Sequence, residues 1–310
     1  YQGTLEDWCK FNFEDSKNNP MGAGKFYMKD SKGEYVSITE LTIPNGITFI
    51  GNYQFYGLTD LTKIVIPKSV VGIGFGAFIA DKELTKIEGA ESVTHIMSMA
   101  FSDCVKLTEI SNFVDLMIIE HSAFHGCSGL TNVEIPKSVI NIGEGAFYDC
   151  TSLEIINVDS KNKYYSSDNG VLYNKDKTCL ITYPATKKDT NFIFLEQIEE
   201  ISPRAFANNV YIEKVELSNN ITIIPGYAFY ECRSLKSIEI PNSVTVIDYW
   251  AFTGCTSLKE VFIPSSVKKM GLSAFYNNHD EQVIYCEHEN QPTDWSSWEN
   301  AKKVVWGYKK

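Results

Sequence analysis

The sequence predicts an α/β (β-rich) solenoid, a fold in which short, similar coils stack on one another. Three observations predict it: phenylalanine recurs every 23 residues, aliphatic residues recur at fixed distances before it, and an apolar cluster with strand-like alternation follows it. A unit of this length cannot enclose its own hydrophobic face, so neighbouring units must share one core.

The phenylalanine column defines the coils. It has two runs with the same 23-residue step: Phe55, Phe78, Phe101, Phe124 and Phe147, and then Phe206, Phe229, Phe252 and Phe275. Alanine precedes every one of these except Phe55, which follows Gln54. An isoleucine lies five positions before each phenylalanine, replaced by Met270 in the last copy. We expect the rings to form a continuous file along the core.

A strand follows each phenylalanine corner. The segments 61–66 and 235–240 read Leu-x-x-Ile-x-Ile, and the alternation at their ends is the period of a strand with one buried face. Proline often comes next and stops the strand because it cannot donate to the ladder, as at Pro67, Pro136, Pro241 and Pro264. Stacked coils then place successive strands parallel, about 4.8 Å apart.

The glycine-rich stretch Gly72-Ile73-Gly74-Phe75-Gly76 raises nucleotide binding as an alternative. A dinucleotide fingerprint needs G-x-G-x-x-G between a strand and a helix. Here the third glycine comes one residue early, and other coils place Met97 or Asp248 in the slot of Gly74. We therefore interpret the stretch as a local variant of a turn and predict no cofactor.

A longer repeat separates the two runs. Phe147 and Phe206 are 59 residues apart, 36 more than one period. Residues 168–184 hold two strand-like runs around the polar turn 174–177, which predicts a hairpin. The columns resume at Phe192, Phe194, Ile198 and Ile201. The insertion is either one longer coil with extra strands or a protruding loop that helps to hold a partner.

The ends of the chain lie outside the columns and predict caps. We expect a single domain over residues 1–310, divided into an N-terminal cap (1–40), a first repeat array (41–160), a long hairpin-containing repeat (161–195), a second array (196–285) and a C-terminal cap (286–310). Residues 4–11 predict a short capping helix. The caps hold four tryptophans that either shield the terminal coils or form a ligand platform: Trp8, Trp295, Trp298 and Trp306.

Composition and isolated polar residues argue against several function classes. The formal charge of −11 disfavours nucleic acids and anionic membranes, and no apolar run is long enough to span a bilayer. Glu120, His121 and His125 are not in the order of a metalloprotease helix, and no nucleophile motif is present.

Five cysteines form one column, three residues after the phenylalanine, which predicts buried thiols and neither a zinc site nor disulfides: Cys104, Cys127, Cys150, Cys232 and Cys255. We predict no catalytic or metal site.

These columns resemble the BspA-type leucine-rich repeats of surface proteins in gut and oral bacteria and some parasitic protists. The resemblance rests on units such as IPKSVINIGEGAFYDCTSLEII (135–156) and IPNSVTVIDYWAFTGCTSLKEV (240–261), and it covers roughly Leu41 to Cys286. It implies a leucine-rich repeat superhelix with one curved parallel β-sheet and with short turns or single helical turns on the opposite face. It also implies a secreted or cell-surface location, with an export signal removed ahead of Tyr1.

Two surfaces are candidates for binding. Ten residues after each phenylalanine a strand side chain should point to solvent, and this column contributes Glu88, Glu134, Glu216, Glu239 and Phe262. Neighbouring lysines make an ordinary solvated sheet the alternative. Beside the corners of adjacent coils, aromatic side chains are expected either to form an exposed patch or to pack over the core: Tyr227, Tyr230, Tyr249 and Trp250.

The sequence therefore predicts a noncatalytic recognition module that binds a protein ligand. The family resemblance suggests adhesion, with host extracellular matrix proteins as candidate ligands. Glycan or cell-wall binding through the aromatic patch is the alternative. An enzyme with its site in the hairpin or the caps is the third possibility, and no set of titratable residues in the sequence supports it.

Overall fold

Stacked 23-residue coils build most of the chain in the computed structural model, which describes residues 4–11, 13, 17, 26–29, 33–296 and 303–309. The chain divides into two compact units, Tyr1–Tyr164 and Tyr165–Lys310. Within each unit, strands of successive coils pair in parallel, which confirms the predicted solenoid class. The single domain, and the boundaries of its arrays and caps, stay predictions.

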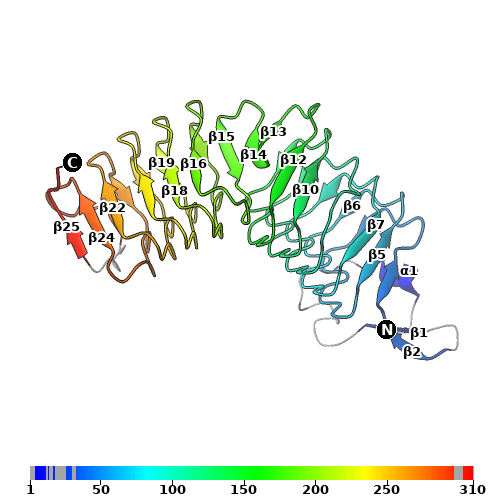
Figure 1. Ribbon diagram of the computed structural model, residues 1–310. Coiled ribbons are helices and arrows are strands. Elements are labelled where there is room, and N and C mark those ends of the chain that lie inside the picture. The colour runs from blue at the N-terminus through cyan, green and yellow to red at the C-terminus, as the bar shows by residue number, and fades with distance from the viewer. Residues whose placement is uncertain are drawn as a thin grey trace. The chain divides into compact units, whose positions relative to one another are not determined.

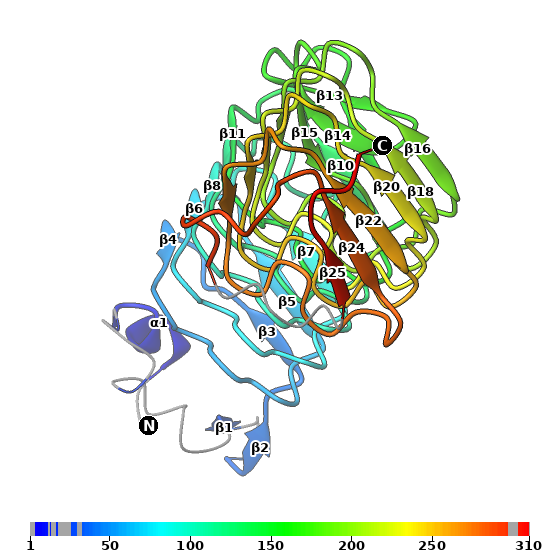
Figure 2. The same cartoon turned by 90° about the vertical axis from the view of Figure 1, so that its left-hand side faces the viewer.

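The first unit has two parallel ladders, seen as separate rows of strands in Figure 2. The longer strands are β3 (Glu40–Thr42), β5 (Lys63–Ile66) and β7 (Lys86–Gly89), followed by the separate pair β10 (Asn132–Ile135) and β12 (Ile155–Val158). The two-residue strands are β4 (Phe49–Ile50), β6 (Gly72–Ile73), β8 (His95–Ile96), β9 (Ile118–Ile119) and β11 (Asn141–Ile142). The antiparallel pair β1 (Tyr27–Lys29) and β2 (Tyr35–Ser37) precedes them.

The second unit repeats this plan. Its longer strands are β16 (Asn191–Ile193), β18 (Lys214–Glu216) and β20 (Ser237–Glu239), then β22 (Glu260–Ile263), β24 (Val283–Cys286) and β25 (Lys303–Val305). Its short ladder is β19 (Ile223–Ile224), β21 (Val246–Ile247) and β23 (Lys269–Met270). Figure 1 shows β18, β22, β24 and β25 following one another toward the C-terminus of this unit.

The short ladder is the main departure from the sequence analysis, which predicted one parallel sheet with turns or single helical turns opposite it. Its strands contain the isoleucine that lies five positions before each phenylalanine, for example Ile73 and Ile247, both fully buried. Two residues are too few to show an alternation, so periodicity could not reveal these strands. Among the described residues the one helix is α1 (Leu5–Trp8), which lies outside the repeats.

The phenylalanine rings form the predicted file within each unit. In the first unit, neighbouring ring centroids lie 5.2 to 5.8 Å apart and the ring planes are within 14° of parallel. In the second unit, neighbouring ring centroids from Phe206 to Phe275 lie 5.0 to 5.3 Å apart.

Tyr183, which the sequence analysis did not identify, stacks on Phe206 with a centroid distance of 4.8 Å and is buried. Its N–H donates to Ala205, as the Phe206 N–H donates to Ala228. Tyr183 therefore occupies the phenylalanine slot of the long repeat.

Backbone hydrogen bonds hold each corner to the next coil. The N–H groups of Tyr53, Phe55 and Gly57 donate to carbonyls of the following coil at 2.8 to 2.9 Å. The residues two before and two after the phenylalanine have positive φ, 52° at Tyr53 and 73° at Gly57, which aligns these alternate N–H groups along the stack.

The glycine-rich stretch is part of this packing. A Cβ on Gly74 would lie 2.7 Å from the Asn52 nitrogen of the preceding coil, so close approach of the two backbones requires glycine there. Gly76 has a φ of 58°, and turns follow it where a nucleotide-binding motif would have a helix. The geometry agrees with a turn variant.

The cysteine column is buried, as predicted. The Cys104 and Cys127 Sγ atoms donate to the Phe78 and Phe101 carbonyls at 3.1 and 3.0 Å. All eight cysteines lie in the described part of the chain and are free thiols.

Asp81 occupies the same column as these cysteines and is fully buried. Its Oδ1 accepts the Leu58 N–H at 2.7 Å, whereas its Oδ2 has no hydrogen-bond partner among the described residues. Burial raises the pKa of the Asp81 carboxyl well above its usual range.

The insertion folds as an antiparallel meander. Its strands are β13 (Tyr165–Asp168), β14 (Val171–Asn174) and β15 (Cys179–Thr182), and the last pairs in parallel with β17 (Glu200–Ile201). The hairpin predicted at 174–177 is confirmed, with the Asn174 Oδ1 accepting the Thr178 and Cys179 N–H groups at 2.9 and 3.0 Å. A second turn joins β13 to β14. The insertion is thus a longer coil with extra strands that return to the solenoid.

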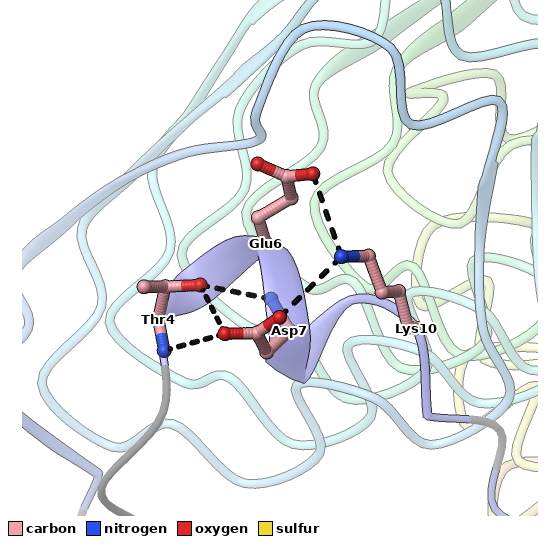
Figure 3. A network of polar contacts seen from close by, with 4 residues as sticks. All are labelled: Thr4, Glu6, Asp7 and Lys10. Carbon is pink, nitrogen blue, oxygen red and sulfur yellow. Dashed lines mark hydrogen bonds and ion pairs between the residues drawn. The ribbon is translucent and has the colours of Figure 1, made fainter.

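The N-terminal helix covers the first coil. Figure 3 shows its capping box, in which the Thr4 Oγ1 accepts the Asp7 N–H at 3.1 Å and the Thr4 N–H donates to the Asp7 Oδ2 at 3.2 Å. The buried Trp8 donates its Nε1–H to the Gln54 carbonyl at 3.0 Å, and the Gln54 Nε2 donates to the Trp8 carbonyl at 2.7 Å. Gln54 takes the place of the usual alanine, and its two hydrogen bonds with Trp8 hold the helix against the solenoid.

Tryptophans also cover the last coil. Trp295 is buried and its ring lies 5.8 Å from that of Trp306, which supports the shielding role for this pair. Trp298 lies outside the described residues.

Removing one ring from the file tests the shared core. Phe101→Ala deletes a side chain stacked on both faces, and we expect it to lower the free energy of unfolding by about 3–5 kcal/mol, measured by urea denaturation. The exposed Thr108→Ala in the same coil is the control and should change it by less than about 0.5 kcal/mol. A Phe101→Ala loss equal to that of the control would refute a continuous core.

Replacing the buried carboxyl tests its cost. Asn209 occupies the same column and is satisfied, its Nδ2 donating to Pro184 at 2.9 Å and its Oδ1 accepting from Ile212 at 2.8 Å. We therefore expect Asp81→Asn to stabilise the fold by about 1–3 kcal/mol at pH 7.5.

The pH dependence of folding stability tests whether the Asp81 carboxyl is the group that costs stability. Because the folded pKa of Asp81 is raised, the parent protein loses stability as pH rises through the unfolded pKa toward the folded one. The gain from Asp81→Asn should therefore be smaller at pH 4 than at pH 7.5 in melting-temperature measurements. The exposed Asp115→Asn serves as the control, and a gain for Asp81→Asn that does not grow with pH would contradict the argument.

Candidate functional site

The outward column of the second unit forms a groove. Glu216, Glu239 and Phe262 come from β18, β20 and β22, which are neighbours in Figure 2. They line one open cavity of about 800 Å³, together with Tyr285 and Tyr308. The structure thus brings three of the five predicted strand-face residues into a single concave site, here called the strand-face groove.

One end of the strand-face groove is acidic. Glu216 and Glu239 lie directly opposite each other in the parallel register. The Lys214 Nζ contacts the Glu216 Oε1 at 2.5 Å, and this hydrogen bond, with the nearby charges of Glu216 and Glu239, raises the pKa of Lys214. Glu287 also lines the groove and accepts the Ser265 N–H at 2.9 Å. The groove lining thus holds three carboxylates and one ammonium group, with Glu287 on the coil of Tyr285.

The other end is aromatic. Phe262 pairs with Tyr285 across β22 and β24, and their rings stack with centroids 4.9 Å apart and planes at 11°. Tyr308 packs against both, at 5.5 Å from Phe262 and 4.8 Å from Tyr285. Tyr285 belongs to the predicted column, one coil beyond Phe262, and extending the column would have found it. Tyr308 lies a further 23 residues on, but β25 pairs in a shifted register that places Val305 opposite Tyr285, so the spacing alone does not give its position.

Glu88 and Glu134 lie in the first unit and are not part of this groove. Glu88 contacts Lys86 at 2.8 Å and Lys63 at 3.0 Å, and these hydrogen bonds and charges lower the pKa of Glu88. The Asn157 Nδ2 donates to Glu134 at 2.7 Å. On this part of the sheet the carboxylates have local partners, which agrees with the alternative of an ordinary solvated face.

The four corner aromatics of the second unit form one cluster, here called the corner patch. The Tyr227 ring lies 5.4 Å from Tyr230, 5.4 Å from Tyr249 and 5.0 Å from Trp250. The Arg204 guanidinium lies 4.8 Å from the centroid of the Tyr227 ring. Tyr249 and Trp250 are 43% and 38% exposed. Tyr227 and Trp250 both occupy left-handed corner positions of adjacent coils, which explains why they meet.

Other chemistry has little support in the described residues. No group of three or more His, Cys, Asp or Glu side chains among them is placed to hold a metal ion. His125 stacks on Tyr148 at 5.2 Å, and its Nδ1 lies 3.2 Å from the Ser102 hydroxyl. Within the same part of the chain, no helix has the length and apolar character needed to cross a membrane.

Comparison with protein families agrees with the repeat geometry. The family model described as "BspA type Leucine rich repeat region" matches in six copies, over residues 31–154, 100–189 and 181–298. The chain belongs to this family. Leucine-rich repeat solenoids are typically binding scaffolds without catalytic activity.

Solved structures of bacterial proteins resemble this BspA-type chain. A leucine-rich repeat protein from Eubacterium ventriosum is 29% identical with a TM-score of 0.64, covering 87% of this chain and 66% of its own. A leucine-rich cell surface protein from Faecalibacterium prausnitzii is 27% identical with a TM-score of 0.69, covering 88% and 80%. The pneumococcal vaccine antigen PcpA is 26% identical with a TM-score of 0.67, covering 91% and 69%.

This chain thus spans just under two thirds of the Eubacterium protein. No curated protein matches it.

Proposed function

We propose that this chain is a noncatalytic recognition module that binds a protein ligand in the strand-face groove of the second unit. The observation that supports it is the cavity of about 800 Å³ over β18, β20 and β22, with an aromatic cluster at one end and charged groups at the other. Aromatic residues are enriched in protein interfaces, and a polar rim around them sets orientation.

The proposal includes secretion or display at the cell surface and adhesion to host extracellular matrix proteins. Its support is the family, together with relatives described as a cell surface protein and as a vaccine antigen. The net charge of −11 favours ligands with a basic surface over nucleic acids.

Glycan or cell-wall binding through the corner patch is the second candidate. It is favoured by the partial exposure of Tyr249 and Trp250 beside Tyr227, because exposed rings offer apolar faces on which sugar rings can pack.

Filling the groove tests the first candidate. Ser237 is exposed on β20 and lines the groove, so Ser237→Trp places a bulky ring in it without touching the core. Against a panel of purified matrix and serum proteins in surface plasmon resonance, we expect at least one to bind the parent chain, and Ser237→Trp to weaken that binding by at least about tenfold.

The matched control is Asn132→Trp. Asn132 is the exposed residue of the same column, eight after the phenylalanine, in the first unit. It should leave binding unchanged. The proposal fails if no protein in the panel binds, or if the two variants bind equally well.

A glycan array tests the second candidate. If the corner patch holds a sugar, Trp250→Ala should weaken binding to the preferred glycan by about tenfold. Tyr276→Ala is the control, because Tyr276 is 49% exposed and is not one of the four corner-patch rings. Equal losses in both variants, or no glycan bound by the parent chain, would remove this candidate.

A further inference from the structure

We infer that the free edge of β16 pairs with an extended, uncharged segment of the protein ligand, which adds one strand to the sheet of the second unit. This inference rests on the proposed function and extends its site. Ile193 of β16 lies ten residues after Tyr183, in the outward column, and pairs in register with Glu216, which lines the strand-face groove. A segment on this edge is therefore continuous with a ligand in the groove.

One edge of β16 has backbone groups without hydrogen-bond partners. Figure 2 shows β16 at the end of the row that continues with β18 and β20, and it pairs in parallel with β18 alone. The Thr190 carbonyl accepts the Lys214 N–H at 3.0 Å, and the Phe194 N–H donates to β18 at 2.9 Å. Because backbone groups point alternately to the two sides of a strand, those of Asn191 and Ile193 point away from β18. Within the described residues, no hydrogen bond to these groups is present.

The side chains along this edge are mostly apolar. Residues 190–195 read Thr-Asn-Phe-Ile-Phe-Leu and contain no charged residue and no proline. Ile193 is 65% exposed, the largest fraction of any large apolar side chain that the structure describes, and Leu195 is 38% exposed. On the other face of the strand, Phe194 is buried and Phe192 is half-buried. A strand added here would meet apolar side chains on both of its faces.

The composition of β16 differs from that of edges which resist pairing. Exposed edge strands commonly carry charged residues, which prevent unwanted pairing with other chains. The edge strands β3 and β25 follow this rule with Glu40 and Lys303. β16 has no such residue, and its aromatic and β-branched side chains favour strand pairing.

These features specify the chemistry of the ligand segment. Its backbone must be extended, because an extended segment bonds the alternate N–H and C=O groups of a sheet edge. A charged side chain would lose hydration beside Ile193 without gaining an oppositely charged partner in residues 190–195. Threonine, valine and similar side chains instead bury apolar surface there. At about 3.3 Å per residue, a run of about five residues covers the edge.

Labelled peptides test the class of ligand. The probe is a fluorescein-labelled nonapeptide of alternating threonine and valine, measured by fluorescence polarisation against the full chain. One version replaces valine by lysine, which adds charge, and another replaces it by proline, which removes N–H groups needed for pairing. We expect the valine peptide to bind most tightly and both other peptides at least about tenfold more weakly.

Two variants separate the backbone from the side chain. Asn191→Pro removes one N–H from the free edge and leaves the hydrogen bonds to β18 in place, because proline is tolerated where the N–H of an edge strand faces solvent. Ile193→Ser removes the exposed apolar group and keeps the backbone intact. We expect each variant to weaken binding of the valine peptide by about tenfold.

The matched control is Asn132→Pro. Asn132 begins β10, the first strand of its own sheet, at the same column position in the first unit. This variant should leave the affinity for the valine peptide unchanged. Hydrogen exchange measured by mass spectrometry should show that the valine peptide protects residues 190–195 and not residues 131–135.

Four results would overturn the edge inference: no saturable binding of the valine peptide, equal binding of the valine peptide and either other peptide, unchanged affinity in either β16 variant, or a dimer of the full chain in sedimentation that Asn191→Pro abolishes. The last result would assign the edge to a second copy of the chain. If Ser237→Trp still weakens binding of a matrix protein in these cases, the groove remains the interface and only the edge inference is wrong. If Ser237→Trp leaves that protein bound, the proposed function fails as well.

Discussion

Stacking of the corner phenylalanines in a fixed 23-residue register is the constraint on which each unit depends. The rings lie 5.0 to 5.8 Å apart, and the backbone hydrogen bonds of the corners run from each coil to the next in the same register. A coil of different length would break both sets of contacts. The insertion respects this constraint, because its extra residues all precede Tyr183, which lies one period before Phe206 and takes the ring position.

The same constraint leaves the outward positions free to vary. Along a strand, side chains alternate between core and solvent, so Ile238 must stay apolar while its neighbours Ser237 and Glu239 need not. The two units use this freedom differently. In the first, Glu88 lies between two lysines. In the second, the corresponding positions combine acidic and aromatic side chains over one cavity. The chemical difference between the units therefore arises on a common backbone plan.

Features that recur in every coil could be predicted from the sequence, and features that occur once could not. The ring file, the buried thiols and the outward column each repeat at a fixed spacing, so a single chain supplies many independent observations of them. Tyr183 was missed because a tyrosine replaces phenylalanine in the most irregular repeat. Gln54 stood out as an exception, but its bonds to Trp8 depend on a helix far away in sequence. Tyr308 completes the groove one period after Tyr285, but β25 pairs three residues out of that register, so the spacing could not show how Tyr308 is placed.

The two candidate surfaces differ in shape and in the chemistry of their side chains. In the corner patch, Tyr227 contacts three rings and the Arg204 guanidinium, so a ligand would meet groups that are largely paired. In the strand-face groove, carboxylates outnumber the basic groups of the lining, and two of them face each other. The groove combines these carboxylates with three packed aromatic rings in one concave site, which is why we place protein recognition there.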